Sequence, residues 1–174
     1  MRQMFFLLIL FSFNFLHAQQ YVFPGSWEGK WQGDMQWHQT GKDTAVIVKM
    51  KLNIEKTESA GVWNWQLVYG ADETDSRPYK LIQKDEKGIH WVIDELSGIV
   101  LDQYRVAGKL CGVFTVMNST ILNSYWMEGD HLIVEFYSIG CKPISTTGKG
   151  NDEIPFVDSY RVGSYQKAVL TRVK

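Results

Sequence analysis

The chain has 174 residues, of which 45% are hydrophobic and 21% charged, enough apolar material for the core of one globular domain. Its 18 Lys and Arg nearly balance 19 Asp and Glu, which disfavours nucleic acid or an anionic membrane surface as a partner. After the first 18 residues, no apolar stretch is long enough to cross a membrane.

Residues 1–18 have the pattern of a secretory signal peptide. Arg2 supplies a positive charge, residues 4–15 are almost all apolar, and Ala18 offers a small residue at the cleavage position. The apolar run is shorter than the roughly 20 residues of a membrane-spanning helix. We therefore predict export to the periplasm or the exterior, with one domain over residues 19–174. Without Arg2 that domain has 17 Lys and Arg against 19 Asp and Glu, a net charge of −2.

Residues 26–38 alternate strictly between two kinds of side chain. The even positions are polar or charged, whereas the odd positions are aromatic, methionine or glycine: Trp27, Gly29, Trp31, Gly33, Met35 and Trp37. An extended chain places successive side chains on opposite faces. The segment is therefore predicted to be a strand with one buried and one solvated face.

Nine further strands are predicted from similar patterns. They cover residues 46–54, 63–69, 79–84, 89–95, 99–106, 110–117, 121–128, 131–139 and 160–173. The inward face of 99–106 is ambiguous because both parities mix polar and apolar side chains, and 140–159 shows no strand pattern and is expected to be a long loop. Short strands joined by turns predict an all-β fold, an antiparallel up-and-down barrel of about 8–10 strands. A two-sheet sandwich with a tryptophan-rich core remains the alternative.

Gly25-Ser26-Trp27, at the head of the first predicted strand, resembles the Gly-x-Trp signature of lipocalins and the wider calycin group. In that family the Trp closes the narrow end of the barrel, and an Arg or Lys from the last strand packs across it. Arg172 stands near the end of the last predicted strand. The resemblance therefore implies a lipocalin-like barrel closed by Trp27 and Arg172. The family's Thr-Asp-Tyr turn motif is missing, and ten strand candidates are more similar to the fatty-acid-binding proteins of the same group.

The open end of such a barrel is the expected binding site. Alternate connections lie at the same end, so 140–159 is expected at the mouth as a candidate lid. Val46 and eight further residues are expected to point inward near that mouth: Met35, Trp37, Leu67, Tyr69, Tyr79, Val116, Asn123 and Phe136. This lining is largely apolar and aromatic with a few polar groups, which favours a small hydrophobic molecule.

Two other functions are weighed against ligand binding. A non-enzymatic interaction or structural module of the envelope or secreted fraction would have a barrel filled by tryptophans and no cavity. An enzyme is disfavoured because few ionisable residues are candidates for the interior: Glu95, Arg105 and, if the parity of the last strand slips, Arg161. No metal or cofactor motif occurs, so none is expected.

The two cysteines, Cys111 and Cys141, allow opposite interpretations. An even count in an exported protein is typical of a disulfide. The predicted strand order, however, places them at opposite ends of the barrel, which disfavours a bridge.

Overall fold

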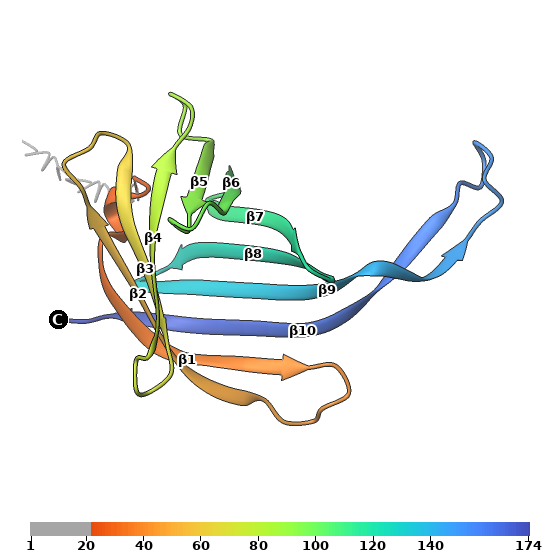
Figure 1. Ribbon diagram of the computed structural model, residues 1–174, viewed down its shortest axis with the longest axis horizontal. Coiled ribbons are helices and arrows are strands. Elements are labelled where there is room, and N and C mark those ends of the chain that lie inside the picture. Colours follow the sequence, from red (N-terminus) through yellow and green to blue (C-terminus); the bar gives the residue numbers. More distant parts are fainter. Residues whose placement is uncertain (1–21) are drawn as a thin grey trace, which may run out of the picture.

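The computed structural model describes residues 22–174, which form a closed barrel of ten antiparallel strands (Figure 1). After a short 3-10 turn at Gly25–Trp27, the strands are β1 (Gly29–Gln39), β2 (Val46–Lys56), β3 (Val62–Tyr69), β4 (Asp75–Gln83), β5 (His90–Asp94), β6 (Val100–Val106), β7 (Lys109–Val116), β8 (Ser119–Glu128), β9 (His131–Thr147) and β10 (Val157–Arg172). Each strand pairs with its neighbours in sequence, and β1 pairs with β10. The predicted up-and-down barrel is therefore confirmed, and the sandwich alternative is wrong. The predicted signal peptide, residues 1–18, lies outside the described residues.

The alternation in β1 orients its side chains as expected. Trp31 and Met35 are buried in the barrel, whereas Gln32 and Asp34 are exposed outside it. Gly33 lies where β10 passes very close, because a Cβ built there would collide with the Val169 carbonyl oxygen. Glycine in this strand thus allows the first and last strands to approach and close the barrel.

Strand β6 resolves the ambiguous segment. Its inward side carries a polar residue, Gln103, which is fully buried next to the apolar Leu101. Gln103 is tolerated there because it accepts a hydrogen bond from Asn123 on β8. Because Gln103 is polar but occupies an inward-facing position, the alternation of polar and apolar residues in this strand was not clear from the sequence.

The expectation of a long loop at 140–159 is wrong. Strand β9 continues to Thr147 and β10 begins at Val157, so only residues 148–156 form the connecting turn. The two strands run beyond the barrel as a hairpin, residues 139–162, which we call the arm (Figure 1). Register shifts between β9 and β10 interrupt the alternation there, which explains why the sequence shows no clear strand. Ile144 and Phe156 on the arm are each 68% exposed.

Both cysteines are free thiols in the structure. Cys111 Sγ lies 3.5 Å from Ser124 Oγ, and Cys141 Sγ lies 3.7 Å from Thr120 Oγ1. Within residues 22–174, no helix is long and apolar enough to span a membrane.

Candidate functional site in the barrel interior

One end of the barrel is filled by aromatic side chains. The Phe23 ring packs edge-on against Trp27 and Trp91, with centroids 4.6 and 5.0 Å away, and Trp63 lies 5.7 Å from Trp91. The indole N–H of Trp31 donates to the Trp27 carbonyl at 2.8 Å. Because Trp27, Trp31 and Trp91 are each at most 2% exposed, this end is a solid aromatic plug.

Arg172, the last residue of β10, contacts the chain around the start of β1. Its guanidinium stacks on Trp31, whereas the family resemblance had implied packing on Trp27. Its Cζ lies 4.3 Å from the Trp31 ring centroid, because the two residues are direct partners across β1 and β10. The same guanidinium donates to the carbonyl oxygens of Ser26, at 3.0 Å, and Glu28. These carbonyls flank Trp27, so Arg172 holds the backbone on both sides of that residue without covering its ring.

The opposite end of the barrel holds a cavity of about 680 Å³. Its walls come from all strands of the barrel except β5, and from the β5–β6 connection: Met35, Trp37, Val48, Tyr69, Asp75, Arg77, Glu95, Ile99, Leu101, Phe114, Thr115, Val116, Ile121, Phe136, Tyr137, Ser138 and Gln166. The lining is mainly apolar and aromatic. Cavities of this size and character are typical of small-molecule sites.

A smaller cavity of about 80 Å³ lies in the same interior and shares Tyr69, Glu95 and Phe136 with the large one. Gln103 and Asn123 line it and are buried. Asn123 Nδ2 donates to Gln103 Oε1 at 2.9 Å, and neither Gln103 Nε2 nor Asn123 Oδ1 has a hydrogen-bond partner among residues 22–174. Trp37 Nε1 is likewise buried and unpartnered. The walls of the interior therefore contain buried donors and an acceptor whose hydrogen bonds are not made within the described part of the chain.

Apart from Val46, all eight residues predicted to point inward near the mouth line one or both of these cavities, and their part in binding stays a prediction. Met35, Trp37 and Val116 line the large cavity alone, Leu67, Tyr79 and Asn123 line the small one alone, and Tyr69 and Phe136 line both. Val46, also expected to point inward, is half exposed and lines neither.

Sequence reasoning missed several other lining residues. Asp75 and Arg77 lie ahead of the predicted strand 79–84, although they continue the odd parity that Tyr79 sets and belong to β4. Phe114 shares the inward parity of Val116 on β7 and was overlooked. Extending the alternation of 79–84 backwards would have found Asp75 and Arg77, and following the parity of Val116 along its own predicted strand would have found Phe114.

The large cavity contains an ion pair. Arg77 donates from Nε and Nη2 to the two Asp75 carboxylate oxygens, both at 2.8 Å. These hydrogen bonds lower the pKa of Asp75 and raise that of Arg77. The Arg77 Cζ also lies 4.9 Å from the centre of the Tyr69 ring. Burial raises the pKa of Tyr69 to about 12, so its hydroxyl remains a neutral hydrogen-bonding group.

Of the three ionisable residues expected inside, only Glu95 lines the cavity. Arg105 lies over the Phe23 ring at the plugged end, at 4.5 Å, and Arg161 is exposed on the arm. Within residues 22–174, no three His, Cys, Asp or Glu side chains gather as a metal site would require.

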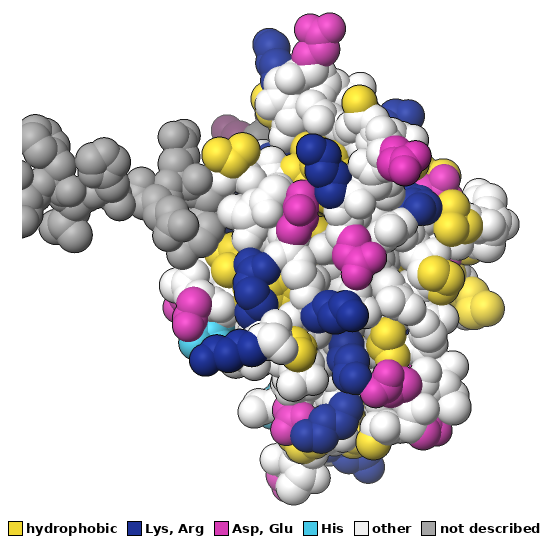
Figure 2. All heavy atoms as spheres, turned by 90° about the vertical axis from the view of Figure 1, so that its left-hand side faces the viewer, with side chains coloured by type: hydrophobic (Ala, Val, Ile, Leu, Met, Phe, Trp, Pro, Cys, Tyr) yellow, Lys and Arg dark blue, Asp and Glu magenta, His cyan; other side chains and the backbone are white. Residues whose placement is uncertain are grey.

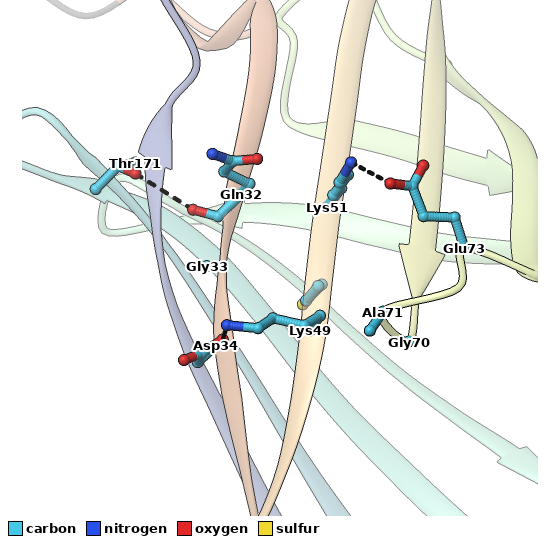
Figure 3. Close-up of a pocket in the computed structure, with 10 residues that line it drawn as sticks. Gln32, Gly33, Asp34, Lys49, Lys51, Gly70, Ala71, Glu73 and Thr171 are labelled. Carbon is cyan, nitrogen blue, oxygen red and sulfur yellow. Dashed lines mark hydrogen bonds and ion pairs between the residues drawn. The ribbon is translucent and has the colours of Figure 1, made fainter.

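A second hollow, of about 500 Å³, lies on the outer surface of β1 and β2 (Figure 3). Its charged groups are paired: Lys49 Nζ lies 2.6 Å from Asp34 Oδ1, and Lys51 Nζ lies 2.5 Å from Glu73 Oε1. Figure 2 shows charges of both signs interspersed over one face of the molecule. Since its charges neutralise one another, the outer hollow is a weaker candidate than the interior.

No family model matches the sequence, and no curated protein matches it either. Among solved structures, the barrel is similar to a protein of unknown function from the DUF3598 family of Nostoc punctiforme PCC 73102, with a TM-score of 0.58, 15% identity and 84% of this chain covered. This chain spans about half of that protein, 47% of its length. A zebrafish ileal bile acid-binding protein complexed with cholic acid gives a TM-score of 0.47 at 13% identity, covering 84% of this chain and 98% of its own. The Nostoc likeness shows a shared fold and nothing about a shared ligand.

Proposed function

We propose that this protein is an exported, calycin-like binding protein that holds a small hydrophobic molecule inside its barrel. The observation that carries the proposal is the cavity of about 680 Å³ with its mainly apolar lining. The Gly25-Ser26-Trp27 motif and Arg172 at the meeting of the terminal strands support the calycin assignment. Export rests on the sequence of residues 1–18, and an N-terminus starting at Gln19 in protein secreted by a bacterial host would support it.

Ligand binding is tested with N-phenyl-1-naphthylamine, an uncharged apolar dye whose fluorescence rises in apolar surroundings. Val48 lines the cavity, whereas its neighbour Ile47 is 56% exposed on the outside of β2. Val48→Trp should fill the cavity and weaken dye binding by about tenfold or more, because a bound dye and a new indole would compete for one volume. Ile47→Trp adds the same side chain outside and should bind like the wild type.

A dye that fails to bind the wild-type protein, or that binds Val48→Trp and Ile47→Trp equally well, would contradict the proposal. Circular dichroism spectra of both variants verify that the barrel is intact.

A further inference from the structure

Within residues 22–174, three ionisable side chains other than tyrosine line the two cavities: Asp75, Arg77 and Glu95. The guanidinium is already engaged, because two of its N–H groups meet both oxygens of Asp75 at 2.8 Å. Paired donors on a carboxylate form the strongest class of side-chain hydrogen bond. An anionic ligand would therefore have to compete with Asp75 for Arg77.

Glu95 has no such counter-charge. It follows β5, is half-buried, and lines both the large and the small cavity. Among residues 22–174, no Lys, Arg or His lies within ion-pair distance of its carboxylate. The hydroxyl of Tyr79, in the small cavity, lies beside Glu95 and also contacts Arg77, whose charge is paired with Asp75. Two carboxylates against one guanidinium leave the cavity with one uncompensated negative charge.

The remaining walls also suit a positive charge. Trp37, Phe114, Phe136 and Tyr137 line the same volume, and aromatic rings attract cations through their faces, as the Tyr69 ring already does with Arg77. A carboxylate placed here would meet the uncompensated charge of Glu95, and like charges in a partly desolvated site repel.

We infer that the natural ligand is a hydrophobic cation, an apolar body carrying a protonated amine whose charge is balanced by Glu95. The inference rests on the proposed function and adds the charge class of the ligand. The apolar body occupies the cavity between Met35, Phe114 and Phe136, and the ammonium group lies against the β5–β6 side of the mouth.

The test is displacement of the uncharged dye by three ligands of equal chain length: dodecylamine, dodecanol and dodecanoate, each below its micelle concentration at neutral pH. We expect the amine to displace the dye at a concentration about tenfold lower than the carboxylate, with the alcohol between them. Glu95→Gln should abolish the preference for the amine over the carboxylate, with each displacement measured against the dye affinity of that same variant. Glu86→Gln, on an exposed turn outside the cavity, should keep it.

Dodecanoate displacing the dye as well as or better than the amine would overturn the inference, and so would an amine preference that survives in Glu95→Gln. Either result leaves the binding function standing, because the dye itself still binds. Absence of binding by the dye and by all three ligands would instead remove the proposed function, and the inference with it.

Discussion

The two ends of the barrel contain the same kinds of residue in different states of packing. At the closed end, Trp27, Trp31 and Trp91 are buried, and the Phe23 ring packs against Trp27 and Trp91. The indole N–H of Trp31 donates to the Trp27 carbonyl, and the indole N–H of Trp91 also donates to a backbone carbonyl. At the open end, the inward residues surround a volume of about 680 Å³ instead of filling it. One alternating pattern therefore produces both a plug and a cavity.

The difference arises from what covers each end. The segment at residues 22–28 folds across the closed end, where Arg172 fastens it through the Ser26 and Glu28 carbonyls. At the other end the arm runs outward, and none of residues 139–162 lines the cavity. The tightly packed residues are thus at one end of the barrel, and the cavity is at the other.

Truncating one tryptophan at each end should give the largest contrast. Trp31→Ala removes a fully buried indole together with its hydrogen bond to Trp27, and should lower the free energy of unfolding by about 3–5 kcal/mol. Trp37→Ala, at the half-buried cavity wall, should cost less than about 2 kcal/mol and instead weaken dye binding. Urea denaturation and dye titration measure both quantities.

Equal losses of stability in the two variants would show that the ends do not differ as described. Trp31→Phe, which keeps an aromatic ring, provides a milder variant if Trp31→Ala does not fold.

The fold was predictable from the sequence because the period of two extends over nearly every strand. The alternation predicted that Trp31 and Met35 lie on the buried face of their strand, which they do. The same argument predicted that Tyr69 and Phe136 point inward, and both line the cavity. Burial of Gln103 was not predictable, since its partner Asn123 stands 20 residues away and the pairing depends on the register of β6, β7 and β8. The volume left unfilled was not predictable either, because it depends on how side chains from ten strands pack.

The next largest effect is expected from the contacts that Arg172 makes at the closed end of the barrel. Arg172→Gln removes the stack on Trp31 and the hydrogen bonds to two carbonyls, and should lower the free energy of unfolding by about 1–3 kcal/mol. Arg172→Lys keeps the charge but not the planar fork, so it should recover only part of the loss. Dye affinity should not change in either variant. Full recovery by lysine would mean that charge alone matters there.

Alkaline pH should destabilise the barrel through its buried tyrosines. The pKa of Tyr69 rises from 10.0 to about 12 in the folded state, so the unfolded chain loses this proton first. The free energy of unfolding should therefore fall as the pH rises from about 10 to about 12. Tyr69→Phe should show a smaller fall than the wild type, and Tyr160→Phe, on the arm, should follow the wild type. Denaturation at several pH values measures these slopes, and identical slopes in all three proteins would contradict the assignment to Tyr69.

The smallest effect is expected from shortening the arm. Ser145 and Ser159 face each other across β9 and β10, so residues 146–158 can be replaced by an Asn-Gly turn that keeps the hairpin register. The removed segment exposes Phe156 and Ile154 to solvent and contributes no residue to either cavity. The free energy of unfolding should stay within about 0.5 kcal/mol of the wild type, and dye affinity should be unchanged. A larger loss of stability would show that the arm supports the barrel, and weaker dye binding would show that it shapes the cavity.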